Sequence, residues 1–368
     1  MGQETPVGPL KRISAFYDHL DLPTEQRTYL VLDTGNYITY AFRPDSRAID
    51  WLVGRITGTD WKSRLGTMAL ETGSVVPSLL SFVPMIRSET VTVAAEDPFD
   101  VAVIGDRITL LELNGGRVST IAIDDPVKLR SEIERRKRLP DSINTVPIVE
   151  ADPDYPYVVE EYLDGRELVD PITEWESLLV ALEQLTALYE TDRQRIETAT
   201  AVASLEDRLT AEQGSDRTVR SALDLLAHLD LPPALYRGSV HGDLHAGNVF
   251  VNDGVYLLDW EDVREDYLVD DLFRPFVIHH YDTPLHRVFV EMMENRGVGG
   301  RIVTDYARTI GPIAYGESKP YSGLPLFYLL SLLADVTPHG SLRTPCRELL
   351  SGVVSAYRRV SSRSGTTR

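Results

Sequence analysis

The chain has 368 residues, 43% of them hydrophobic, which is enough apolar material for the cores of two or more domains. Its formal net charge of -19 argues against nucleic acid as a partner, because binding nucleic-acid phosphates requires a basic surface. No stretch is apolar for long enough to span a bilayer, the N-terminus lacks a signal-peptide core and the single Cys346 forms no internal disulfide, so we expect a cytoplasmic protein without membrane contact.

The basic residues are strongly biased, because only five of the 37 are lysines and the others are arginines. An acidic, lysine-poor composition is typical of proteins from salt-loving organisms, in which salt screens the repulsion between surface charges. An ordinary acidic cytosolic protein is the alternative interpretation. The composition thus indicates a halophilic protein and leaves its oligomeric state open.

Residues 1–95 contain no motif with an obvious chemical role. The runs YLVLD and YITYAF predict two strands across the turn Thr34-Gly35-Asn36, and the apolar spacing over residues 46–56 predicts a helix. We expect an accessory α/β extension of unknown role here.

Regular strand patterns begin near residue 96. The runs VAVI, ITLLEL and RVSTIAI, separated by Gly105-Asp106 and Asn114-Gly115-Gly116, predict a three-stranded antiparallel meander. A helix over residues 127–139 should follow Asp125-Pro126, and two short strands come after it.

The second half of the chain is mainly helical in pattern. Residues 173–191 have apolar side chains at helical spacing, and Thr173 with Glu176 predicts a capping box at the start of this helix. Residues 285–360 are typical of a bundle of helices.

The densest group of polar residues lies between Val240 and Asp271. Two apolar runs flank Asn252-Asp253-Gly254, a strong hairpin signal, so Asn248 should lie roughly opposite Asp259. An amide oxygen and a carboxylate at the open end of a hairpin are suitable ligands for Mg²⁺. Asp243, in the preceding loop, could take the proton of an attacking hydroxyl group.

These residues also carry a family resemblance. His241, Asp243 and Asn248 reproduce the H-x-D-x-x-x-x-N spacing of a kinase catalytic loop, and Asp259 stands where its metal-binding Asp would stand. The wording HGDLHAGN followed by LDWE resembles the aminoglycoside phosphotransferase and choline kinase-like family. The resemblance implies an α+β, bilobal protein kinase-like fold. Its parts would be an antiparallel small lobe with hinge over 96–163, a mainly helical large lobe with catalytic loop and acceptor site over 164–368, and the N-terminal extension.

The resemblance further implies a role for each matching residue. Asp243 would be the catalytic base, and Asn248 and Asp259 would hold the metal ion. The remaining matches fall into two groups, one that binds nucleotide and one that braces the catalytic loop. The nucleotide group is Gly105, Glu132 and the backbone from Glu161 to Leu163, and the bracing group is His241, His245 and Asp271.

The small-lobe half of the pattern is incomplete. The family usually carries a lysine on the third strand to neutralise the α- and β-phosphates, but Thr120 or Ala122 occupies its place here. Lys128 lies four residues before Glu132 and is better explained as a surface pair. Whether another Lys or Arg reaches Glu132 is left open.

Together these features predict a phosphotransferase that moves the γ-phosphate of ATP to a hydroxyl group of a small molecule, such as a sugar or an amino alcohol, with ATP and Mg²⁺ bound. The alternative is a catalytically impaired nucleotide-binding pseudokinase or regulatory scaffold. Retention of Asp243, Asn248 and Asp259 together favours the enzyme, because a scaffold needs neither a base nor metal ligands.

The charge balance predicts that salt stabilises the fold. At low ionic strength the excess of acidic groups repel one another, so we expect the melting temperature to rise as NaCl is increased from millimolar to molar concentrations. Thermal unfolding followed by circular dichroism measures this. A melting temperature independent of salt would favour the ordinary acidic protein.

Overall fold

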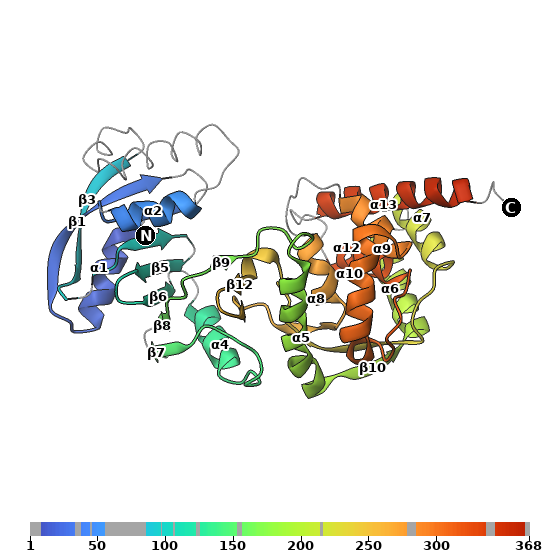
Figure 1. Cartoon of the computed structure of the whole chain (residues 1–368), viewed down its shortest axis with the longest axis horizontal. Coiled ribbons are helices and arrows are strands. Elements are labelled where there is room, and N and C mark those ends of the chain that lie inside the picture. The colour runs from blue at the N-terminus through green and yellow to red at the C-terminus, as the bar shows by residue number, and fades with distance from the viewer. Residues whose placement is uncertain are drawn as a thin grey trace, which may run out of the picture. The chain divides into compact units, whose positions relative to one another are not determined.

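The computed structural model describes residues 9–33, 38–44, 46–55, 86–96, 98–105, 107–122, 126–152, 157–213, 216–277, 285–335 and 343–364. The chain divides into two compact units (Figure 1). Unit 1 consists of Met1–Lys137 and Val146–Asp164, and unit 2 consists of Arg138–Thr145 and Gly165–Arg368.

Unit 1 is built on an eight-stranded sheet in which every pair of neighbours is antiparallel. The strand order is β3-β1-β2-β4-β5-β6-β8-β7. The N-terminal strands belong to this sheet, because β2 pairs with β4 along its whole length. The strands are β1 (Thr24–Asp33), β2 (Thr39–Phe42), β3 (Ile86–Ala94), β4 (Val101–Ile104), β5 (Arg107–Glu112), β6 (Arg117–Ala122), β7 (Ile148–Asp152) and β8 (Tyr157–Glu161).

Helices cover both faces of this sheet, since alternate side chains of each strand point to opposite faces. Helix α1 (Pro9–His19) packs on one face, where Phe16 joins a cluster with Ile108 and Ile121. Helix α2 (Ser46–Arg55) packs on the other face, against Val101 and Leu111. Helix α4 (Pro126–Arg136) packs there too, because its Leu129 and Ile133 contact Val158 and Ala122.

The predicted strands and helices of this unit are confirmed, with changed limits. The meander is β4-β5-β6, and the helix expected over 127–139 is α4, which ends at Arg136. The turn at 34–36 and residues Asp106 and Asp125 lie outside the described residues. The division into residues 1–95, 96–163 and 164–368 remains a prediction.

Unit 2 is mainly helical, with two small antiparallel sheets of order β10-β11-β14 and β13-β12-β9. Its strands are β9 (Arg166–Glu167), β10 (Gln194–Glu197), β11 (Ala234–Val240), β12 (Val249–Val251), β13 (Val255–Leu257) and β14 (Arg264–Tyr267). Its helices are α5 (Trp175–Asp192), α6 (Thr198–Gln213), α7 (Arg217–Leu226), η2 (Ala246–Asn248), α8 (Asp270–Phe273), η3 (Arg274–Phe276), α9 (Leu285–Met293), α10 (Gly297–Thr309), α11 (Gly311–Ala314), α12 (Leu324–Asp335) and α13 (Arg343–Ser364). An antiparallel sheet in unit 1 and a helical unit 2 confirm the predicted α+β fold class.

The first helix of unit 2 begins differently from the prediction. Helix α5 starts at Trp175 after Glu174, and no side chain caps it, so the capping box of Thr173 and Glu176 is wrong. The Glu174 carboxylate instead accepts hydrogen bonds from the backbone N–H groups of Val169 and Asp170. The preceding loop, rather than the helix end, takes up the acidic side chain.

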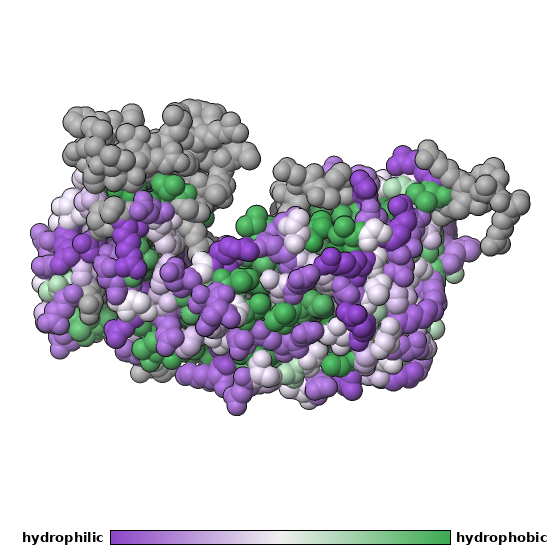
Figure 2. Space-filling view, viewed as in Figure 1, coloured by the Kyte–Doolittle hydropathy of each residue, from purple (hydrophilic) through white to green (hydrophobic). Residues whose placement is uncertain are grey.

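Hydrophilic residues cover much of the visible face of each unit, with smaller hydrophobic areas between them (Figure 2). This distribution agrees with the strong net charge of the chain. Among the described residues, no helix is both long enough and apolar enough to cross a membrane.

Cys346 lies inside unit 2 with 2% of its surface exposed, and burial raises the pKa of its thiol to about 11. A buried thiol remains protonated at neutral pH and is a poor nucleophile. We therefore predict that an aromatic disulfide reagent reacts with the folded protein far more slowly at pH 8 than with the protein unfolded in urea. Equal rates would show that Cys346 is accessible in the folded state.

Candidate active site

The loop that carries Asp243 leaves strand β11 and is tied to the segment that enters β14. Val240 at the end of β11 pairs with Arg264, the first residue of β14. Gly242 has a φ of 85°, and a Cβ at this position would lie only 2.0 Å from the carbonyl oxygen of Asp262. Only glycine fits this backbone conformation and this close approach. The tight turn brings Asp243 next to the chain that follows Asp259.

A buried carboxylate, Asp271 at the start of α8, holds this loop. Its Oδ2 accepts hydrogen bonds from the backbone N–H of His241 at 2.9 Å and from the hydroxyl group of Tyr189 at 2.9 Å. Its Oδ1 accepts a longer bond from the N–H of Gly242 at 3.3 Å. These contacts are those expected of a brace, because one fully buried acid satisfies three donors from two separate segments.

The two histidines of the motif make different contacts. The ring of His241 is buried, and its Nε2 lies 2.9 Å from the carbonyl oxygen of Leu258, which requires a proton on Nε2. The Nδ1 of His245 accepts a hydrogen bond from the N–H of Gly247 at 3.0 Å, so its proton is on Nε2, 3.6 Å from Asp243 Oδ2. Burial lowers the pKa of His245, which favours the neutral ring beside Asp243.

The predicted hairpin is present, but its register differs by one residue. Val249 pairs with Leu257 and Val251 with Val255, so Asn248 lies opposite Leu258 rather than Asp259, and the N–H of Leu258 donates to Asn248 O at 2.9 Å. The three-residue loop closes on the pair Val251 and Val255, which determines all the pairs that follow. Asp259 lies one residue beyond and has a φ of 55°, an uncommon conformation for a residue other than glycine and one concentrated at functional sites.

Asn248 and Asp259 offer oxygen atoms suited to a hard divalent cation. The amide nitrogen of Asn248 donates to the carbonyl oxygen of Asp243 at 2.9 Å, which assigns Oδ1 as the end of the amide that can bind a metal. Within the described part of the chain, Asp259 Oδ1 is buried and has no hydrogen-bond partner. A buried carboxylate oxygen without a donor fits a cation site, so these residues are compatible with Mg²⁺.

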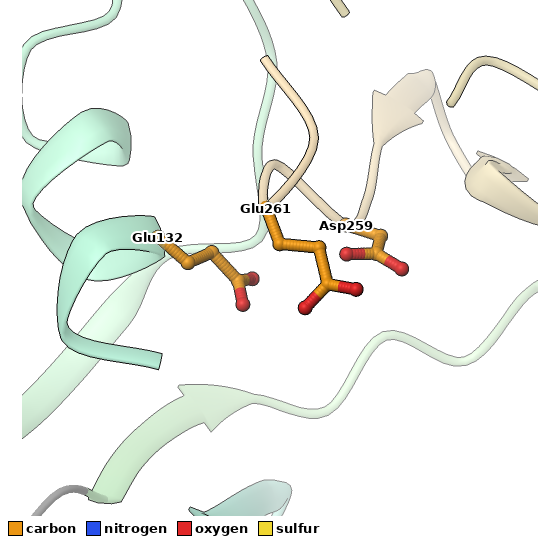
Figure 3. A group of neighbouring side chains, drawn as sticks. All are labelled: Glu132, Asp259 and Glu261. Carbon is orange, nitrogen blue, oxygen red and sulfur yellow. The ribbon is translucent and has the colours of Figure 1, made fainter. Parts of the chain in front are cut away.

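Glu261 is a neighbouring acid that the sequence interpretation did not include. Asp259 and Glu261 both project from the segment that follows β13 (Figure 3), and carboxylate oxygens of the two residues lie within 4.8 Å of each other. The sequence Asp-Trp-Glu already indicated a second acid here, since this Glu is two residues beyond the predicted metal ligand. Glu261 is therefore a further candidate ligand.

Asp243 is partly buried and lies among charged groups of both signs. Burial raises the pKa of its carboxyl group; the guanidinium of Arg274 opposes this, and the acids Asp262 and Asp259 add to it. Arg274 Nε lies 3.7 Å from Asp243 Oδ1. Its Nε is buried and has no hydrogen-bond partner among the described residues, so the contact with Asp243 is electrostatic.

Arg274 and two further residues beside Asp243 were also missed by the sequence interpretation. Asp270, 6% exposed, lies 2.9 Å from Arg264 Nη2 and 3.8 Å from Arg274 Nη1. Arg264 Nη1 also donates to the carbonyl oxygen of Gly242. In the sequence, Arg274 is a single basic residue directly after the apolar pair Leu272-Phe273. This pattern is what could have marked it as a candidate site residue.

The residues predicted to bind nucleotide belong to unit 1. Gly105 is in the turn between β4 and β5, and Glu132 projects from α4 with 7% of its surface exposed (Figure 3). The N–H of Glu161 donates to Pro147 O at 3.1 Å and is therefore already used in the sheet. The N–H of Tyr162 likewise donates to Gly116 O at 2.8 Å, so Leu163 remains the candidate donor of the predicted hinge backbone.

Asp271, which holds the loop of Asp243, is the residue of this site whose removal we expect to destabilise the fold most. Asp271→Ala leaves three donors without their acceptor, so we expect a loss of about 3–5 kcal/mol in the free energy of unfolding, as for breaking a buried charged contact. Urea unfolding measures it. Asp192 is a matched control, because its carboxylate also accepts two bonds, from Ser239 N and Oγ, but is exposed. Asp192→Ala should cost no more than about 1 kcal/mol, and equal losses would contradict the role of burial.

The chain is similar, at low sequence identity, to solved structures that include the following three. One is a thermostable mutant of aminoglycoside phosphotransferase APH(4)-Ia in a ternary complex with AMP-PNP and hygromycin B, with 13% identity, a TM-score of 0.40 and coverage of 68% of this chain and 89% of that chain. Macrolide 2'-phosphotransferase MphH from Brachybacterium faecium has 15% identity, a TM-score of 0.42 and coverage of 69% and 86%. Choline kinase LicA from Streptococcus pneumoniae has 15% identity, a TM-score of 0.37 and coverage of 70% and 88%.

The sequence comparisons give a family and no individual relative. No curated protein sequence matches the chain. Residues 126–300 match the model of the phosphotransferase enzyme family APH. The matched range contains α4, the catalytic-type loop, the hairpin and the brace at Asp271. Residues 126–300, a little under half of the chain, thus match this family, in agreement with the resemblance of the loop and hairpin.

Proposed function

We propose that this protein is a Mg²⁺-dependent kinase that transfers the γ-phosphate of ATP to a hydroxyl group of a small molecule. The observation that carries the proposal is the clustering of Asp243, Asn248 and Asp259 in unit 2. The Asn248 amide bonds the backbone of Asp243, and Asp259 is close enough to raise the pKa of the Asp243 carboxyl group. The match of residues 126–300 to the phosphotransferase enzyme family APH supports the same reaction class.

Asp243 is the base of the proposed reaction. As the acceptor oxygen forms its bond to the γ-phosphorus, the bond from that phosphorus to the oxygen of ADP breaks, and the hydroxyl proton passes to the Asp243 carboxylate. Arg274, 3.7 Å away, favours the ionised form that can accept this proton. The Nε2 of the neutral His245 ring lies 3.6 Å from the other carboxylate oxygen of Asp243, and we assign the role of base to Asp243 alone.

The metal ligands of the proposed site are Asn248 Oδ1, the Asp259 carboxylate and, in addition, Glu261. Mg²⁺ held there would neutralise charge on the β- and γ-phosphates. The buried Asp259 oxygen without a donor supports this assignment. The acceptor is a small alcohol, for which a sugar or an amino alcohol is the first choice to test.

The test separates the base from the metal ligands. In molar salt with Mg²⁺, wild type should transfer ³²P from γ-labelled ATP to at least one member of a panel of sugars and amino alcohols. Asp243→Asn should lower transfer by about 10²–10⁴-fold, the usual contribution of a general base, with Mg²⁺-dependent ATP binding retained. Asp259→Asn should instead abolish the Mg²⁺ dependence of binding, measured by calorimetry.

The exposed hairpin residue Asp253 provides the control, since Asp253→Asn removes an acid of the same type outside the cluster. It should leave binding and transfer unchanged. If Asp243→Asn transfers phosphate as fast as wild type, Asp243 is not the base. ATP binding by wild type without transfer to any acceptor would favour the regulatory scaffold.

A further inference from the structure

Glu132 has a cationic partner that comes from an unexpected strand. Arg107 Nη1 lies 2.7 Å from Glu132 Oε2, with 27% of the arginine side chain and 9% of the glutamate side chain exposed. Arg107 is the first residue of β5, whereas the family lysine belongs on the next strand, β6. The helix acid is thus paired with a cation although β6 holds no lysine.

The sheet register explains how one strand can replace the other. Arg107 pairs with Ala122, one of the two residues at the expected lysine position, and Thr109 pairs with Thr120, the second. Directly opposed residues of an antiparallel pair project from the same face, with Cβ atoms about 4.5–5.5 Å apart. Ala122 packs with Leu129 on the face that α4 covers, so Arg107 also starts on that face. A long side chain from Arg107 can therefore reach the point that a lysine at 122 would reach.

Arg136 and Lys128, two basic residues of α4, are less suited than Arg107 to bind phosphates at this position. Arg136 is nearly buried and bonds Glu160 at 2.6 Å and the carbonyl oxygen of Val146, which ties α4 to the strands beside it. Lys128 is exposed on the first turn of the helix. Arg107, in contrast, forms a close charged contact with Glu132.

Arg107 also adjoins the turn predicted to cover the phosphates. Gly105 lies two residues earlier, and its N–H donates to the carbonyl oxygen of Arg107 at 2.9 Å. A guanidinium has five N–H donors in a planar fork and stays protonated, so it can hold a carboxylate and phosphate oxygens together. On the basis of the proposed function, we infer that Arg107, positioned by Glu132, binds the α- and β-phosphates of the nucleotide in place of the missing lysine.

The test measures nucleotide binding and does not depend on turnover. Arg107→Met should weaken binding of Mg²⁺-ATP and Mg²⁺-ADP by about 10- to 100-fold, as for loss of one charge-assisted contact, with adenosine affinity nearly unchanged. Isothermal titration calorimetry in molar salt gives all three constants. Arg107→Met combined with Ala122→Lys returns a lysine to β6 and should recover at least half of the lost binding free energy.

Two further variants keep the result interpretable. Arg107→Met with Glu132→Gln removes the charge of Glu132 together with that of Arg107, so a folding defect that the buried acid causes in the single variant would be relieved while weak phosphate binding persists. Arg87 on β3, exposed and paired with Glu89 at 2.5 Å, is the matched control, and Arg87→Met should bind ATP as wild type does. Unchanged ATP affinity in Arg107→Met, an equal loss for adenosine, or no ATP binding by wild type would each overturn the inference.

The outcome is separable from that of the proposed function. Loss of phosphate affinity in Arg107→Met, with no acceptor phosphorylated by wild type, would support the role of Arg107 and refute the kinase activity. Asp243-dependent transfer that is insensitive to Arg107→Met in both affinity and KM for ATP would support the kinase and refute the role of Arg107.

Discussion

The candidate site depends on one buried carboxylate, Asp271. It is fully enclosed and accepts bonds from the backbone of His241 and Gly242 and from Tyr189 on α5. Burying a carboxylate raises the free energy of the folded state unless its oxygens accept hydrogen bonds. The backbone N–H groups of His241 and Gly242 in turn need an acceptor, and Asp271 is the acceptor at this place. The position of Asp271 in the fold of unit 2 therefore determines the backbone path of the loop that carries Asp243. The positive φ of Gly242 is a consequence, because the chain must turn sharply between this brace and Asp262.

Sequence patterns predicted most of the frame because the frame follows local rules. Alternating apolar residues determined the strands of unit 1, and Asn252-Asp253-Gly254 determined the hairpin. The position of Asp259 depends on the register of that hairpin, and the predicted pairing differs from the observed one by one residue. Arg274 could not be assigned from sequence, because its contact with Asp243 spans 31 residues and follows from how α8 and η3 leave β14. Side-chain partners of this kind depend on tertiary packing, which composition and periodicity do not encode.

The small lobe lacks a lysine on the strand where the family carries one, since Thr120 and Ala122 stand at that position. The relevant constraint is the distance to Glu132, and in an antiparallel sheet that distance can be met from the opposing residue of the next strand. Arg107 meets it with a side chain longer than that of lysine. An absent residue in a motif is thus weak evidence for an inactive protein until its cross-strand neighbours have been considered.

The arginine bias of the whole chain connects these observations. Only five of the 37 basic residues are lysines, and in the described part of the chain several buried acids are paired with arginines: Glu132 with Arg107, and Asp270 with Arg264 and Arg274. A guanidinium stays charged on burial and offers several donors, so one arginine can bridge acids that a single ammonium would serve poorly. Arg264 does this by binding the carboxylates of Asp266 and Asp270, and it also donates to the Gly242 carbonyl oxygen. A composition that replaces lysine by arginine therefore need not remove a phosphate anchor, since the geometry that a bridging arginine requires can place it on a different strand.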